Sequence, residues 1–136
     1  MKEELNNESI RALVAYRFQR AEETLAEIPY LKSQGYYNTA VNRMYYACYY
    51  AAVALLIQHR INPSTHAGVK QMIGMHFVAT GRLSKEAGRS FSLLFERRHS
   101  SDYDDFAYSS QEEIDELLPK AKGFIQAVRD LLQQES

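Results

Sequence analysis

The stretch Tyr36–Ile61, with the sequence YYNTAVNRMYYACYYAAVALLIQHRI, decides the fold of this chain. At 3.6 residues per turn it makes a helix of about seven turns. Its apolar and aromatic residues form two stripes, the first of Tyr37, Val41, Met44, Tyr45, Cys48, Ala52, Leu55 and Leu56 and the second of Tyr46, Tyr50, Val53 and Ile57. A helix that is apolar nearly all round is a buried one, so we expect the other elements to pack around it.

Amphipathic helical patterns occupy most of the remaining chain. Ile10, Leu13 and Val14 begin a three- and four-residue repeat that continues to Leu31, and Asn7 or Ser9 is the expected N-cap. Pro29 is expected to bend or end this helix, and Gly35 to close the connection to the central one. Similar patterns predict a short helix ending at Thr80–Gly81, a helix from Ser84 to about His99, and a last helix capped by Ser109 or Ser110 that contains Pro119.

Residues 100–110, SSDYDDFAYSS, interrupt these repeats and are expected to form an ordered loop. No segment shows the alternation of a half-buried strand. The predicted fold is therefore all-α: an up-and-down four-helix bundle with an additional short helix, in a single domain spanning residues 1–136.

Composition narrows the classes of function. The 136 residues include 16 basic and 17 acidic ones, so any nucleic-acid binding must come from a local patch. The single cysteine, Cys48, lies in the apolar helix and is expected to be a buried core residue. The N-terminus lacks a signal-peptide pattern and no apolar run is long enough to cross a bilayer, which predicts a cytoplasmic protein without membrane contact.

Two kinds of site are suggested by charged residues near the end of the fourth helix. Glu96 and His99 share one helical face with the E-x-x-H spacing of di-iron bundles, but such a site needs two copies and the chain has one. No metal and no cofactor is therefore expected, although a metal-dependent bundle enzyme stays an alternative.

The second kind is a phosphate site. Arg97, Arg98 and His99 would form a cationic pocket if Asn42 and Arg43 faced them, because arginine binds phosphate bidentately. Tyr45, Tyr46 and Tyr103 would add hydroxyls or stacking faces. The alternative is structural, with Arg43 paired to Asp102 or Asp104 and tying the loop to the helix.

Three motifs resemble those of the HEPN domain family, in its stand-alone prokaryotic branch. They are NRMYYA at residues 42–47, THAG at 65–68 and the R-x-x-A/S-D-Y segment that ends at Tyr103. The resemblance covers about residues 10–132. It implies a helical bundle that forms a homodimer, with a cleft that holds polar residues of both copies. It also implies a metal-independent RNase or a toxin neutralised by a nucleotidyltransferase-type protein partner.

The resemblance also assigns residue roles. RNase members carry an arginine at the end of the fourth helix, followed after four to six residues by a histidine; here Arg98, or else Arg97, takes the arginine position. Tyr103 stands five residues after Arg98 in place of the histidine, and His99 is directly adjacent to Arg98. The literal R-x5-H from Arg60 to His66 follows the second helix, which is the wrong place for the motif.

The expected catalytic residues are thus Arg98, His99 and Tyr103. The expected ligand-binding residues are Asn42, Arg43, Tyr46, Arg97 and Asp102. Tyrosine is a slow base at pH 7, so weak or absent RNA cleavage is expected. The sequence thus predicts a nucleic-acid- or nucleotide-binding protein, with a dimeric protein-interaction adaptor as the alternative.

Overall fold

All regular structure in the described residues is helical, which confirms the all-α prediction. The computed structural model describes the backbone of residues 6–103 and 109–135 and the side chains of residues 6–98 and 109–135. The elements are α1 (Asn7–Ala26), α2 (Ile28–Ser33), α3 (Tyr37–Gln58), α4 (His66–Ile73), a π-helical turn η1 (Gly74–Val78), α5 (Lys85–Tyr103) and α6 (Gln111–Gln134). Within these residues no helix is long and apolar enough to cross a membrane.

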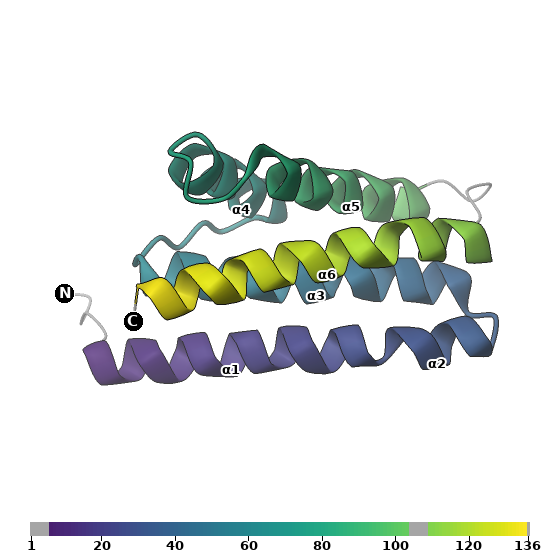
Figure 1. Ribbon diagram of the computed structural model, residues 1–136, viewed down its shortest axis with the longest axis horizontal. Helices are drawn as coiled ribbons and strands as arrows, with labels where there is room; N and C mark the ends of the chain where they lie inside the picture. Colours follow the sequence, from purple (N-terminus) through teal and green to yellow (C-terminus); the bar gives the residue numbers. More distant parts are fainter. Residues whose placement is uncertain (1–5, 104–108, 136) are drawn as a thin grey trace.

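The central position of α3 is confirmed, since α1, α5 and α6 all pack against it. Figure 1 shows α1 and α2 following one another along one side of α3 and α6, with α5 along the other side. An aromatic column crosses the core, because Phe91 stacks on Tyr45 at 6.2 Å and on Phe124 at 4.9 Å between ring centroids. All three side chains are at most 1% exposed. Burial of each is worth about 1.5–3 kcal/mol, so the column is a main tie between α3, α5 and α6.

Side-chain caps fix where several helices begin. Asn6 caps α1 by accepting a hydrogen bond from the Ser9 amide at 2.8 Å, so the predicted cap was one to three residues too late. Thr65 caps α4 through the Gly68 amide at 2.9 Å, and Ser110 caps α6 through that of Glu113 at 3.2 Å. Each cap satisfies an amide that the helix itself leaves without a partner.

One predicted boundary in the second half of the chain changes. The backbone of α5 stays helical to Tyr103, so the first part of the expected loop at residues 100–110 is helix. Each added residue gains a backbone hydrogen bond and no glycine or proline interrupts this stretch, which explains the longer helix. Pro119 lies inside α6, and Pro29 lies in the first turn of α2, where the helical pattern of the first half divides.

The environment of Cys48 matches its predicted core role. The side chain is fully buried, and its sulfur lies 3.7 Å from the Ala121 carbonyl oxygen on α6. Burial raises the pKa of the thiol far above its ordinary value. Cys48 is therefore a packing residue rather than a nucleophile.

Candidate functional site

Arg98 of α5 lies against tyrosines of α3. Its Nη2 atom donates a hydrogen bond to the Tyr46 hydroxyl at 3.0 Å. The guanidinium carbon lies 5.5 Å from the centroid of the Tyr46 ring and 5.7 Å from that of Tyr45, within the range of cation–π attraction. Two of the predicted site residues, Arg98 and Tyr46, are thus brought together from elements 52 residues apart in the sequence.

His66, the first residue of α4, joins the same place. Its Nδ1 atom lies 2.8 Å from the hydroxyl oxygen of buried Tyr45. Its ring stacks on Tyr49 with centroids 4.3 Å apart and planes 9° apart. The Thr65 cap fixes the start of α4, and with it the position of the imidazole. We call Tyr45, Tyr46, Tyr49, His66 and Arg98 the Arg98 cluster.

The hydrogen bond to Tyr45 selects one form of the His66 ring. Burial raises the pKa of Tyr45, so this hydroxyl keeps its proton, and we assign it as the hydrogen-bond donor to Nδ1. Burial, and then the charge of Arg98, lower the pKa of His66, so the ring is neutral at pH 7. A neutral ring that accepts at Nδ1 carries its hydrogen on Nε2. His66 therefore presents an N–H donor beside the Arg98 guanidinium.

The cluster continues along α3 toward α1. Tyr50 lies 6.1 Å from Tyr46 between ring centroids, and the Arg20 guanidinium lies 5.8 Å from the Tyr50 centroid. Tyr46, Tyr49 and Tyr50 are all partly exposed. Burial raises the pKa of Tyr49, and the charge of Arg17 on α1 acts in the opposite direction. Part-exposed aromatic rings thus alternate with cations on this face.

Arg43 faces α1 instead. Its Nε atom lies 3.2 Å from a carboxylate oxygen of Glu27, and its Nη2 atom lies 3.5 Å from the Thr24 hydroxyl. The partners considered for Arg43 from the sequence were Asp102 and Asp104. The side chain of Asp102 and the whole of Asp104 lie outside the described residues. Neighbouring Asn42 is half-buried on the same helix.

Arg97 faces α6. It forms a two-pronged ion pair with Glu113, with Nη2 to Oε2 at 3.0 Å, and donates to the Ser109 hydroxyl at 3.3 Å. The hydrogen bonds that Arg97 donates to Glu113 raise the pKa of Arg97 above its ordinary value. Because successive helical residues are about 100° apart, Arg97 and Arg98 contact different neighbours. Of the three arginines predicted for the pocket, Arg43 and Arg97 contact other helices and Arg98 contacts the tyrosines of α3.

Several predicted residues have no described side chain. The side chains of His99, Asp102 and Tyr103 lie outside the described part, so their roles stay predictions. Glu96, the partner of His99 in the metal alternative, lies 3.9 Å from Lys70. Among the described residues, no group of three histidine, cysteine or acidic side chains is arranged to hold a metal ion.

His66 is the site residue that the sequence interpretation missed. Its position in the T-H-x-G turn was the available signal, since that turn is one of the three family motifs. The residue was given no role because the R-x5-H that it completes with Arg60 follows the second helix, which is the wrong place for the motif; it also lies 32 positions before Arg98 in the chain. Their proximity depends on how α4 returns across α3.

Comparison with known proteins confirms the family. The HEPN domain family matches residues 14–131, and the chain belongs to this family. A UPF0332 protein of Thermotoga maritima is 33% identical over 121 residues, which cover 89% of this chain and 92% of that protein. A Methanocaldococcus jannaschii protein named "putative toxin" is 32% identical over 130 residues, 96% of each chain. The crystal structure of an archaeal HEPN homologue has a TM-score of 0.67 at 21% identity, covering 86% of this chain and 95% of the other, and supports the fold.

Proposed function

We propose that this chain is a toxin-like HEPN protein that binds RNA, or the phosphate of a nucleotide, at the Arg98 cluster. The names of two Methanocaldococcus jannaschii relatives support the toxin-like role. The ligand chemistry is argued from the residues. A guanidinium is a strong hydrogen-bond donor to phosphate oxygens, and part-exposed tyrosines offer stacking faces to bases.

The observation that carries the proposal is the position of Arg98 against the tyrosines of α3, in the neighbourhood of His66. The Tyr46 hydroxyl holds Nη2 at 3.0 Å, which orients the guanidinium fork. The His66 Nε2–H adds a second kind of donor at the same place. Both groups can donate hydrogen bonds to a phosphate oxygen, and the neighbouring tyrosine rings can stack on the attached base.

The adaptor alternative has support from the other two arginines. Arg43 is engaged with Glu27 and Arg97 with Glu113, so both tie helices together. For these residues the structural interpretation is favoured over ligand binding. The proposal rests on Arg98 because of its contacts with the Tyr46 hydroxyl and the neighbouring rings. A homodimer and a nucleotidyltransferase-type partner are parts of the proposal that need their own tests.

The sedimentation behaviour of the purified chain tests the dimer. We expect a homodimer at tens of micromolar, on the order of ordinary assembly affinities. A monomer at that concentration would remove this part of the proposal and leave the Arg98 cluster as a site within one chain.

The phosphate site is tested by titrating labelled single-stranded RNA, and separately a nucleotide, into wild-type protein and into the Arg98→Ala and Arg98→Lys variants. Arg98→Ala should weaken binding about tenfold and lower the slope of log affinity against log salt by about one. Arg98→Lys keeps the charge but loses the fork, so it should retain the salt slope and only part of the affinity.

Arg89→Ala is the matched control, because it removes the same charge from an exposed position of the same helix. It should bind like the wild type. Equal affinity of all four proteins for both ligands would refute the site. If Arg98→Ala leaves binding unchanged but lowers the melting temperature strongly, Arg98 is a structural residue and the adaptor interpretation is preferred.

A further inference from the structure

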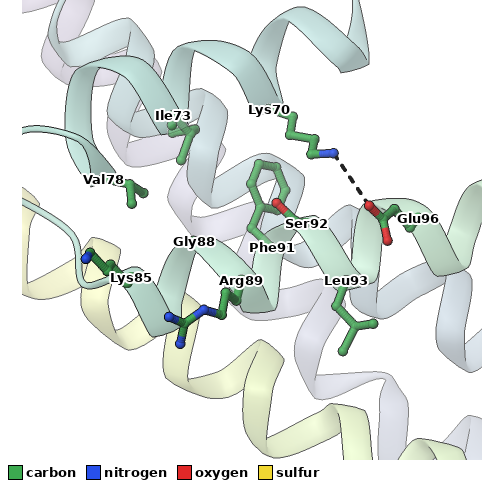
Figure 2. A pocket seen from close by; sticks show the side chains of 11 residues that line it. Lys70, Ile73, Val78, Lys85, Gly88, Arg89, Phe91, Ser92, Leu93 and Glu96 are labelled. Atoms are coloured by element: carbon green, nitrogen blue, oxygen red, sulfur yellow. Dashed lines mark ion pairs between the residues drawn. The ribbon is translucent and has the colours of Figure 1, made fainter.

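A second hollow lies away from the Arg98 cluster, between α4–η1 and α5. It has a volume of about 600 Å³. Ile73 and Phe91 line it but are each 1% exposed, so its accessible apolar surface comes from part-exposed Val78 and from Leu93, which is 40% exposed. Figure 2 shows Ile73 and Val78 on the α4–η1 side, Phe91 reaching toward them from α5, and Leu93 on the opposite side of α5. Exposed apolar side chains at a hollow are a typical feature of a binding groove.

The rim of this groove is predominantly cationic. Lys85 and Arg89 lie four residues apart on α5 and are exposed, and they form no ion pair with any described side chain. Lys70 lies on the opposite rim, 3.9 Å from Glu96, the acidic residue of the lining. Figure 2 shows Lys85 and Arg89 toward one end and the Lys70–Glu96 pair toward the other. The end with Lys85 and Arg89 therefore attracts carboxylates.

The backbone leaves the groove open at one wall. Residues Gly74–Val78 form a π-helical turn closed by the Ala79 amide on the Gly74 carbonyl at 2.9 Å, and such turns are frequent at functional sites. A Cβ atom added at Gly74 would meet no atom within 4 Å. At Gly88, in contrast, it would lie 2.9 Å from Val78 Cγ2. The glycine on α5 permits close packing, and the glycine on η1 leaves free space.

Shape and composition favour a protein segment over a nucleic acid. Phe91, the aromatic ring of the lining, is 1% exposed and offers no stacking face to a base. The groove follows α5 from Lys85 to Glu96, about 16 Å at the helical rise, which matches about three turns of a docked helix. Amphipathic helices bind such grooves through apolar residues at i, i+3, i+4 and i+7.

We propose that this groove docks an amphipathic, acidic helical segment of a partner protein. Apolar side chains of the segment pack against part-exposed Val78 and exposed Leu93, and its carboxylates meet Lys85 and Arg89. This inference goes beyond ligand binding at the Arg98 cluster and does not depend on it.

A designed peptide tests the proposal. The probe is a fluorescent helix of about 14 residues, long enough to be marginally helical, with leucines on one face and glutamates beside them. Its affinity for the full chain is measured by anisotropy. The double variant Lys85→Glu with Arg89→Glu should weaken binding at least about tenfold, and Gly74→Glu, which fills the groove with a side chain of the wrong charge, should do the same.

Gly123→Glu is the matched control, because Gly123 is also a helical glycine whose added Cβ would meet nothing within 4 Å. It should bind the probe like the wild type, whereas a peptide with lysines in place of the glutamates should bind weakly. The proposal fails if the wild type does not prefer the acidic peptide, or if all variants bind it equally. It also fails if Lys85→Glu with Arg89→Glu abolishes RNA binding instead, which would make the groove part of a nucleic-acid surface.

Discussion

The Nδ1 atom of His66 and the hydroxyl oxygen of Tyr45 form a hydrogen bond across 2.8 Å, which links the start of α4 to the middle of α3. Tyr45 is fully buried, while His66 is half-buried and lies beside Arg98. The Nδ1 atom of His66 is thus engaged in a contact within the fold. The Nε2–H group is the hydrogen-bond donor that a ligand would contact.

This hydrogen bond predicts a pH effect. The pKa of His66 in the folded state lies below its ordinary value, owing first to burial and then to Arg98. In the pH range between the folded and unfolded pKa values, the unfolded chain binds more protons. The free energy of unfolding should therefore fall as the pH falls below about 6.5 and should rise with pH through the same range. Urea unfolding across that range measures this, and His66→Gln should flatten the dependence.

The contribution of Tyr45 can be isolated with Tyr45→Phe. Loss of the donor removes a bond that favours the neutral ring, so the pKa of His66 should rise, as followed by NMR titration. Stability should fall by about 1 kcal/mol, the usual size of one hydrogen bond. Tyr30→Phe is the control because Tyr30 is 65% exposed. An unchanged His66 pKa in Tyr45→Phe would show that the hydroxyl does not set the protonation of the ring.

The Arg97–Glu113 pair should contribute to stability rather than to ligand binding. The two side chains are 21% and 22% exposed and meet through two hydrogen bonds. Arg97→Ala should cost about 1–3 kcal/mol, less than for a fully buried pair, because some solvent still reaches both groups. A double-mutant cycle with Glu113→Ala, followed by urea unfolding, measures the coupling. Weak coupling together with a loss of RNA affinity would return Arg97 to the ligand site.

Two glycines should respond oppositely to alanine. At Gly123 an added Cβ meets nothing within 4 Å, so Gly123→Ala should stabilise α6 by about 0.5–1 kcal/mol. At Gly88 the same methyl would lie 2.9 Å from Val78 Cγ2, so Gly88→Ala should destabilise the packing of α5 on η1. Val78→Ala should recover part of that loss in the Gly88→Ala background. Thermal melting of these three variants beside the wild type tests this, and stabilisation by Gly88→Ala would contradict the described packing.

Much of the fold was predictable because it depends on local pattern. The apolar circumference of α3, the caps at Thr65 and Ser110, and the break at Pro29 are all visible in the sequence. Such features depend on residues within one helix or turn. Helical period and capping chemistry therefore suffice to find them.

The candidate site was only partly predictable because it depends on tertiary packing. Adjacent Arg97 and Arg98 contact α6 and α3 respectively, and no sequence pattern shows which of two neighbouring arginines meets which helix. Likewise, Glu27 was not among the partners considered for Arg43, since it lies on the other side of the hairpin. His66 was missed for the same reason, as its contacts with Tyr45 and Tyr49 are made between separate elements.

The final prediction concerns RNA cleavage. Cleavage without a metal needs a base for the 2′-hydroxyl and an acid for the leaving oxygen, and this help is worth about a hundred- to ten-thousand-fold. Tyr103 stands where the resemblance places a histidine, and Tyr45 holds the Nδ1 lone pair of His66, so the neutral ring is a donor rather than a base. We expect metal-free protein to bind single-stranded RNA and leave it intact over hours. Products with cyclic phosphate ends would contradict this. Their loss in His66→Ala would make His66 the proton shuttle, whereas their loss in His99→Ala would assign that role to the residue next to Arg98.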